Sequence, residues 1–505
     1  MAVTTDVTPG PGARPNFLII VLDAARWADF PGVGHPGGVP MPFTQELESH
    51  SIVFPKSVAP APWTIPSHAS LFTGLYPWEH GVNRRGTSDL PGNVSTLSER
   101  LSAAGYRTLS ASSNGFVSPN FGMTRGFGSV AWGDWWEKMI HVPGQTLPSH
   151  GIAVGRTLRA PEGRWWRMAG QATTSLMRYP WTLNLANHVA SHLRAPGARF
   201  HYVSAPWVEP TVRRWVMDQP ADAPVFCFIN FHDTHEPYYP SRGPTESLGS
   251  FLGRTRQRTD QAGFLAGHWT PNPKEIAALH SMYQETFRTL DRRVAEVVSS
   301  FREAGRWENT VLVLTSDHGQ EFLEKGFLFH SLGVSEQLLR IPLVLRLPGD
   351  RRGGQVATGW ASLIDVAPTF LEMAHLPSAF PSGRSLMRLV SAERSEPVLA
   401  MGDGFDYSSG AARACSPERR RFWDHAFAVG YDGDSKVVLD LERRRISSFH
   451  LRMLGTDGEV PLADSDPSTA ALVQEVKRLA ERIPTRSGTP PSEATVDDRL
   501  SSWGY

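Results

Sequence analysis

The sequence predicts an α/β/α sandwich, in which helices cover both faces of a mostly parallel β-sheet. Three unbroken apolar runs carry this prediction: NFLIIVL with its strand at 17–22, VFCFINF at 225–231 and TVLVLT at 310–315. Runs without polar alternation are typical of strands that are buried on both faces, as in a parallel sheet. Stretches of helical periodicity separate the runs, so we expect strands and helices to alternate in one layered domain.

The elements between these runs follow from helix periodicity and from turn residues. Glycines mark the ends of two amphipathic stretches, as expected for residues that follow a helix C-terminus. The expected elements, in chain order, are a helix over 67–72, a helix that ends at Gly105, a strand near Thr108, a long helix over 273–304 closed by Gly305, and a strand over 341–347.

Two segments interrupt the alternation. Residues 131–215 are rich in Trp, Arg, Pro and Gly and show no strand period. This Trp-rich insertion either packs over the domain or forms a lid that shapes a substrate pocket. Residues 241–272 form a polar loop just after His235, which makes them a candidate substrate loop.

Length and composition allow one large domain with a smaller appendage, or two domains. The chain has 505 residues, of which 40% are hydrophobic, enough to bury a sizeable core. Lys plus Arg (50) equals Asp plus Glu (50), so the net charge indicates neither nucleic acid nor an anionic membrane as a partner. Any anion must therefore be recognised by local groups.

The cysteines and the N-terminus bear on the compartment. Cys227 and Cys415 lie far apart and match neither a disulfide framework nor a metal-ligand spacing. The N-terminal residues lack a basic region followed by an apolar run, and no stretch of about 18 apolar residues occurs. We expect a cytoplasmic protein without a membrane span, although a mature secreted form would look the same. The sequence does not indicate the oligomeric state.

Ionisable side chains follow the buried runs at the points where the strands end. Asp23 follows the first run, and Asp317 and His318 follow the third. Ligands bind beyond the carboxyl ends of the strands in such sheets. A single Asp at a strand end is most often a turn or cap residue, but the coincidence of these positions favours a site. Two carboxylates and an imidazole suit one divalent cation, with Mn²⁺ or Zn²⁺ favoured and Mg²⁺ or Ca²⁺ possible.

Thr64, in PAPWTIPSHASLFTG at 60–74, has two interpretations. It could simply cap the following helix, because Thr is a favoured N-cap and Pro66 fits the first turn. It could instead be the fourth metal ligand and the nucleophile. A metal lowers the pKa of a bound hydroxyl, and the helix N-terminus offers N–H donors to a tetrahedral anion.

Five motifs over about residues 16–375 resemble the sulfatase branch of the alkaline phosphatase superfamily: NFLIIVLDAARWADF, TIPSHASLFTGLYPWEHGV, INFHDTHEPY, LTSDHGQEFLEKG and LLRIPLVLRLPG. The resemblance implies a metal-bound nucleophile that attacks phosphorus or sulfur and forms a covalent intermediate. It also implies a large α/β/α domain followed by a smaller C-terminal subdomain. We therefore expect a flexible N-terminus at 1–15, an alkaline-phosphatase-like catalytic domain at 16–390, a C-terminal subdomain at 391–486 and a loosely ordered tail at 487–505.

The chain departs from the sulfatase pattern at the nucleophile. Sulfatases carry Cys or Ser where Thr64 stands, because that residue is oxidised to formylglycine, and Thr cannot become that aldehyde. His68 stands where their pattern has Arg, Ala24 replaces the second Asp of their paired metal carboxylates, and His318 stands where an Asn often follows. This set is more similar to the phosphodiesterases and phosphoglycerol transferases of the superfamily, which use Thr directly.

The resemblance also suggests how the substrate is held. Two-metal members of the superfamily have an Asp-x-x-x-His motif that HDTHEPY lacks, so we expect one metal ion per chain. His235 and His330 then stand where a second cation would neutralise substrate oxygens, and they stabilise charge or protonate the leaving oxygen. Further substrate-binding candidates are His68, Asn114, Lys325 and Arg340.

The predicted function is metal-dependent hydrolysis of phosphate mono- or diesters through a phospho-threonine intermediate. The substrate is a small-molecule phosphate or, less favoured, sulfate ester. One alternative is a transferase that moves a phosphoryl or sulfuryl group to an alcohol, and another is a sulfuric ester hydrolase without formylglycine. A third alternative is an inactive homologue that binds anions without turnover.

Overall fold

The structure is a computed structural model that describes residues 14–32, 37–84, 86–132, 207–236, 238, 261–377, 380–390, 396–404, 415–451, 459–463 and 466–483. Most of the Trp-rich insertion, the first part of the candidate substrate loop and the predicted tail lie outside these residues. Within them, no helix has the length and apolar character that crossing a membrane requires.

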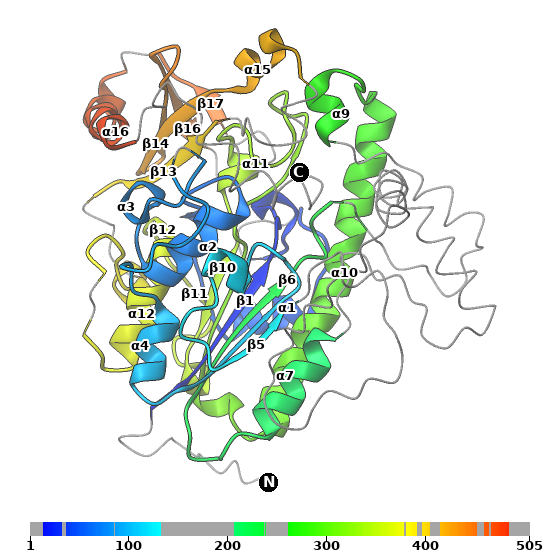
Figure 1. Ribbon diagram of the computed structural model, residues 1–505, viewed down its shortest axis with the longest axis vertical. Coiled ribbons are helices and arrows are strands. Elements are labelled where there is room, and N and C mark those ends of the chain that lie inside the picture. The colour runs from blue at the N-terminus through cyan, green and yellow to red at the C-terminus, as the bar shows by residue number, and fades with distance from the viewer. Residues whose placement is uncertain are drawn as a thin grey trace, which may run out of the picture.

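A mixed, mostly parallel sheet of eight strands lies at the centre of the described structure (Figure 1). Its long central strands are the apolar runs of the sequence, and every residue of β1, β6 and β7 is buried. The strands, in their order across the sheet, are β11 (Gln355–Val356), β2 (Ile52–Val53), β10 (Leu343–Arg346), β7 (Thr310–Thr315), β1 (Asn16–Leu22), β6 (Val225–Phe231), β4 (Arg107–Ser112) and β5 (Ser129–Trp132).

The strand directions place the carboxyl ends of the central strands together. β1 pairs in parallel with both β6 and β7, and β4 pairs in parallel with β6. The carboxyl ends of these neighbouring strands therefore meet at one edge. The predicted strand at 341–347 is the shorter β10, which runs antiparallel to β7 and β2.

Helices cover both faces of the sheet, as the periodicity predicts (Figure 1). Side chains of β1 alternate between two cores, with Leu18 and Ile20 in one and Phe17 and Ile19 in the other. The first core is closed by α1 (Pro42–Ser49), α7 (Val208–Met217) and α10 (Pro273–Glu303). The second is closed by α2 (Thr64–Thr73), α4 (Leu97–Ala103) and α12 (Val366–Met373). The predicted sandwich is therefore confirmed.

A separate antiparallel sheet follows the large domain. Its strands, in order, are β13 (Val398–Asp403), β14 (Ala426–Asp432), β15 (Ser435–Asp440), β16 (Arg445–Leu451) and β17 (Glu459–Pro461). Helix α16 (Ala470–Arg482) buries Leu472 and Val476 against this sheet. The remaining short elements are β3 (Ser57–Val58), α3 (Pro77–His80), α9 (Gln261–Ala266), β8 (Glu321–Phe322), β9 (Leu328–Phe329), α11 (Glu336–Leu339), β12 (Ala361–Ser362), α13 (Leu386–Leu389) and α15 (Pro417–Trp423).

Candidate active site

The predicted strand-end residues meet at the carboxyl edge of the central sheet. Asp23 follows β1, Asp317 follows β7 and His235 lies just beyond β6. The carboxylate and imidazole groups of Asp23, Asp317 and His318 each offer a ligand atom, and these atoms lie within 4.8 Å of one another. All three residues are buried. The structure thus brings together the three side chains that the sequence predicts as metal ligands.

Only one oxygen of each carboxylate, Asp23 and Asp317, accepts hydrogen bonds from the described residues. Asp317 Oδ1 accepts hydrogen bonds from the backbone N–H groups of Ala24 and His318, each at 3.0 Å. Asp23 Oδ2 accepts a hydrogen bond from Asn114 Nδ2 at 2.6 Å. The other oxygens, Asp23 Oδ1 and Asp317 Oδ2, are buried and accept no hydrogen bond from the described residues.

Burial raises the pKa of Asp317 to about 7. Burial, together with the charge of Asp317, raises the pKa of Asp23 to about 6. Two buried carboxylates with unsatisfied oxygens are costly unless a cation or protons compensate their charge. The donor set of two carboxylates and one imidazole therefore fits a divalent cation.

Thr64 is the first residue of α2 rather than its cap. The N-cap position belongs to Trp63, and no side-chain hydrogen bond caps this helix. Thr64 Oγ1 lies 3.4 Å from His318 Nε2. The hydroxyl of Thr64 thus faces Asp23, Asp317 and His318, which we call the candidate cation-binding group, and the backbone of a buried helix N-terminus lies beside it.

His68 contacts the backbone of Thr64 and a neighbouring amide. Its Nδ1–H donates to the carbonyl oxygen of Thr64 at 3.0 Å, and its Nε2 accepts from Asn230 Nδ2 at 3.3 Å. Burial lowers the pKa of His68 to about 3, so the ring is neutral. Because both ring nitrogens are bonded within the chain, the structure does not place His68 as the predicted substrate contact.

Asn114 likewise contacts a metal-ligand candidate. Besides the bond to Asp23, its Oδ1 accepts from the backbone N–H of Phe116 at 2.9 Å. Asn230, at the end of β6, also donates to Asp23 Oδ2, at 3.2 Å. These two amides hold Asp23, which is a different role from the anion contact expected for Asn114.

Three imidazoles gather next to His318 of the candidate cation-binding group, and we call His232, His235, His318 and His330 together the histidine cluster. Ring centroids lie 4.1 Å apart for His232 and His235, 4.6 Å apart for His235 and His330, and 4.7 Å apart for His318 and His330. His235 and His330, which the sequence predicts as catalytic, are therefore neighbours although they lie far apart in the chain.

Hydrogen bonds at Nδ1 orient these rings. The Nδ1–H of His235 donates to the carbonyl oxygen of Glu236 at 2.7 Å, and that of His330 donates to Gln320 Oε1 at 3.0 Å. Burial lowers the pKa of His235, but the charges of Glu236 and Asp23 outweigh this effect and raise it above the ordinary value. Burial lowers the pKa of His330 to about 4.

Glu236 and Gln320 are functional candidates that the sequence does not single out. Glu236 is buried in HDTHEPY, and Gln320 directly follows the DHG motif at 317–319. Gln320 Nε2 donates to Glu236 Oε2 at 2.7 Å. The sequence offers one usable signal. Glu236 directly follows His235 and Gln320 lies two residues after His318, so both stand next to predicted site residues. A charged residue at such a position seldom becomes buried without a partner.

Lys325 and Arg340 have their charged groups bound elsewhere. Lys325 Nζ lies 3.2 Å from Glu459 Oε2 of the C-terminal sheet. Arg340 donates through Nη2 to the carbonyl oxygen of Pro55 at 2.5 Å, and its guanidinium lies 5.3 Å from the centroid of the Trp27 ring. Both charged groups thus have partners within the chain, and the substrate-binding role of these residues stays a prediction.

The C-terminal sheet contacts the segment directly before Thr64 through Asp403, at the end of β13. Trp63, directly before Thr64, donates through Nε1 to both Asp403 oxygens at 3.1 Å. The backbone N–H of Arg84 also donates to Asp403, at 2.7 Å, and the Arg84 guanidinium lies 4.4 Å from the centroid of the Trp63 ring. The smaller sheet therefore helps to fix the entry to α2.

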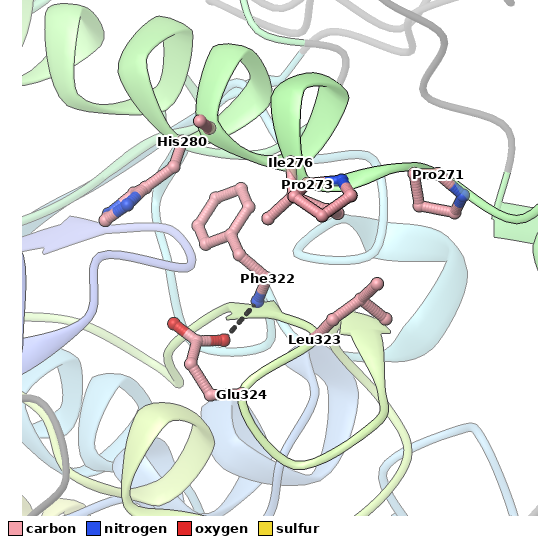
Figure 2. Close-up of a pocket in the computed structure, with 8 residues that line it drawn as sticks. Pro271, Pro273, Ile276, His280, Phe322, Leu323 and Glu324 are labelled. Atoms are coloured by element: carbon pink, nitrogen blue, oxygen red, sulfur yellow. Dashed lines mark hydrogen bonds between the residues drawn. The ribbon is translucent and has the colours of Figure 1, made fainter.

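A cavity of about 390 Å³ lies between the start of α10 and the loop after β8, and none of the predicted site residues lines it (Figure 2). Phe322 and Leu323 face Ile276 and Pro273 across it, with Glu324 and His280 as polar groups at its margin. This cavity is mainly apolar and is distinct from the candidate cation-binding group. Its full lining is Pro271, Pro273, Ile276, Ala277, His280, Phe322, Leu323 and Glu324.

Several known proteins are similar to this chain in sequence or in fold. Arylsulfatase K of Canis lupus familiaris is 24% identical over 395 residues, which cover 75% of this chain and 67% of that protein. A 2-O GAG sulfatase superposes with a TM-score of 0.60 at 15% identity over 93% of this chain and 91% of that chain. The phosphonate monoester hydrolase of Silicibacter pomeroyi gives 0.58 at 17% identity, over 93% and 95% of the two chains.

The match to one protein family covers most of the chain. The family model named Sulfatase matches residues 15–376, a range that includes the strand-end ligands, Thr64 and the histidine cluster. The structural neighbours share the α/β fold of the large domain. The chain therefore belongs to the sulfatase family, in the sulfatase branch of the alkaline phosphatase superfamily.

Proposed function

We propose that this sulfatase-family hydrolase cleaves phosphate mono- or diesters through a covalent intermediate on Thr64. The observation that carries the proposal is the position of Thr64 Oγ1, 3.4 Å from His318 Nε2 and beside two carboxylates with unsatisfied oxygens. A hydroxyl at a helix N-terminus, next to a cation-binding group, is well placed to attack a tetrahedral anion.

Enzymes of the sulfatase family are metal-dependent, and Asp23, Asp317 and His318 would hold the ion. We expect one ion per chain, with Mn²⁺ or Zn²⁺ favoured by the imidazole and carboxylate donors. When bound, the ion lowers the pKa of the Thr64 hydroxyl and neutralises charge on a substrate oxygen.

The reaction then has two steps, in which Thr64 and the imidazoles have different roles. Thr64 Oγ1, after its hydroxyl proton has been released to solvent, forms a bond to phosphorus while the bond from phosphorus to the leaving oxygen breaks. The protonated His235 ring, whose pKa is raised, supplies a proton to that oxygen through Nε2, because its Nδ1 is already hydrogen-bonded, while the neutral His330 ring offers Nε2 as an acceptor. Water next attacks phosphorus and gives a proton back to the imidazole, and the bond from phosphorus to Oγ1 breaks.

Sulfate esters are the second candidate substrates. The relatives include proteins named as sulfatases, which supports a sulfuryl substrate. Thr64 supports the phosphoryl alternative, because Thr cannot become the formylglycine that sulfatases use. An alcohol in place of water in the second step would make the enzyme a transferase.

Trapping the intermediate tests the proposal. The metal-reconstituted protein is mixed with an aryl phosphate, quenched rapidly in acid and analysed by high-resolution mass spectrometry. We expect a phosphoryl group on Thr64, and none in the Thr64→Ala variant. Turnover without any modification of Thr64, or no turnover of any phosphate or sulfate ester at saturating metal, would overturn the proposal.

A further inference from the structure

A hydrogen-bonded chain of buried side chains lies behind the two catalytic imidazoles. Glu236 Oε2 lies 3.7 Å from Nδ1 of His235 and 3.5 Å from Nδ1 of His330. Between Glu236 and His330 stands Gln320, whose Nε2 donates to Glu236 Oε2 at 2.7 Å and to the hydroxyl of Tyr238 at 2.5 Å. The proposed proton transfers use the two imidazoles but assign no role to the residues behind them.

The carboxylate determines which way the amide of Gln320 points. An ionised Glu236 only accepts hydrogen bonds, so the NH₂ group of Gln320 must face it. Burial acts to raise the pKa of Glu236, but the neighbouring charge of His235 and the hydrogen bond from Gln320 outweigh it and hold that pKa well below its usual range. The oxygen of the Gln320 amide then faces His330.

The amide in turn determines the tautomer of His330. Gln320 Oε1 is an acceptor 3.0 Å from His330 Nδ1, so that nitrogen must carry a proton. In the neutral ring, Nε2 is then the nitrogen with the free electron pair. The backbone of Gln320 is fixed as well, since its N–H donates to the carbonyl oxygen of Gln337 at 3.0 Å.

We propose that Glu236 is a positioning residue that acts through Gln320 to hold His330 in the Nδ1–H tautomer and so to offer Nε2 to the substrate. The inference rests on the proposed function in one respect, because it takes His330 to face the substrate. The Nδ1 proton of His235 serves as an internal reference: it is donated to the backbone carbonyl of Glu236, which a change of the Glu236 side chain leaves in place, although loss of the carboxylate charge lowers the pKa of this ring.

Replacing Glu236 by glutamine removes the fixed acceptor. The carboxamide introduced in Glu236→Gln can itself donate to Gln320 Oε1, so the Gln320 amide can rotate and present its NH₂ group to His330. Nδ1 then becomes an acceptor and the proton moves to Nε2. Gln320→Met has the opposite consequence, because it leaves the Glu236 carboxylate facing Nδ1 directly and so preserves the Nδ1–H tautomer.

The test is ¹⁵N NMR of histidine-labelled protein, in which the two tautomers have different imidazole shifts. The signals of His235 and His330 are assigned with His235→Gln and His330→Gln variants. We expect Nδ1–H for both rings in the wild type, loss of the Nδ1 proton from His330 but not from His235 in Glu236→Gln, and Nδ1–H retained on both rings in Gln320→Met. Glu336→Gln, an equally buried Glu that contacts Tyr431 and Lys436, is the matched control and should change neither ring.

Kinetics on the same variants provide the second readout. Glu236→Gln should lower kcat by about 10- to 100-fold with a smaller change in KM, as is typical for partners of site imidazoles. An Nε2–H tautomer of His330 in the wild type, an unchanged His330 tautomer in Glu236→Gln, or wild-type kcat in that variant would overturn the inference. If the wild type turns over no ester, the proposed function fails, while the NMR result still decides the tautomer.

Discussion

The cation side and the histidine side of the site are completed in different ways. On the cation side, formed by Asp23, Asp317 and Thr64, one oxygen of each carboxylate is buried and accepts no hydrogen bond from the part of the chain that the structure describes. On the histidine side, formed by His235, His330, Glu236 and Gln320, each Nδ1 donates to an oxygen and Glu236 accepts from Gln320.

This difference indicates which side of the site depends on a bound ion or on protons. Buried polar atoms without partners are costly, so the cation side needs an ion or protons to be stable. On the histidine side, Nδ1 of both rings and the Glu236 carboxylate already have hydrogen-bond partners, so the rings are oriented before any ligand binds. We expect removal of the ion to affect the two sides very differently.

Removing the ion should have the largest effect. Chelation should abolish activity, because two buried carboxylates would repel each other and Thr64 would lose the group that activates it. Re-addition of Mn²⁺ or Zn²⁺ should restore activity, and metal analysis should find one equivalent per chain. Full activity in chelator without bound metal would contradict the cation side, and two equivalents would mean that the histidine side also binds an ion.

Matched substitutions separate the ligand role from burial. Asp317→Asn should lose both bound metal and activity. Asp291→Asn changes a buried carboxylate that accepts from the backbone N–H and hydroxyl of Thr44, both at 2.8 Å, and should retain the metal. Metal retained at wild-type affinity in Asp317→Asn would exclude Asp317 from the ligand set.

Thr64→Ala should lower turnover by at least about 10³-fold with the fold intact, because only the attacking hydroxyl is lost. Thr64→Ser should keep part of the activity. The control is Thr73→Ala on the same helix, where the hydroxyl donates only locally, to the carbonyl oxygen of Ala69 at 2.6 Å. Steady-state kinetics with circular dichroism compare the variants, and near wild-type turnover of Thr64→Ala would leave Thr64 a purely structural role.

The preference for phosphorus over sulfur should be moderate. A sulfated Thr needs water to attack sulfur again, since it lacks the hemiacetal route that formylglycine offers. We expect kcat/KM to be at least about tenfold higher for a phosphoryl than for the matching sulfuryl ester, or about 1.4 kcal/mol of transition-state preference. Kinetics on paired aryl phosphates, phosphodiesters and sulfates measure the ratio, and a clear preference for sulfate would reverse the assignment of substrate.

Lys325→Ala should have the smallest effect. Lys325 Nζ pairs with Glu459, which also pairs with the buried Lys436 at 2.6 Å. Loss of this partly exposed pair should reduce the free energy of unfolding by less than about 1 kcal/mol and leave kcat/KM unchanged. Chemical denaturation and kinetics measure both quantities. A tenfold loss of kcat/KM would restore the substrate contact that the sequence predicts and would extend the histidine side.

The sequence by itself located the long central strands and the strand-end side chains of the cation side. Strands buried on both faces are apolar along their whole length, so a local pattern is sufficient to locate β1, β6 and β7. Neighbouring parallel strands end at the same edge, and this rule is sufficient to bring Asp23, Asp317 and His318 together. The position of Thr64 at the start of α2 is equally local.

Only the tertiary structure decided which partners the remaining polar groups have. Arg340 and Lys325 lie close in sequence to the site, yet their charges bind Pro55 and Glu459. Asp403 holds Trp63 although 340 residues separate them. A side chain's hydrogen bonds depend on which segment packs opposite it. The local periodicity of a sequence indicates which face of a helix or strand a residue occupies, but not which segment packs against that face. The positioning role inferred for Glu236 could therefore be recognised only in the folded chain.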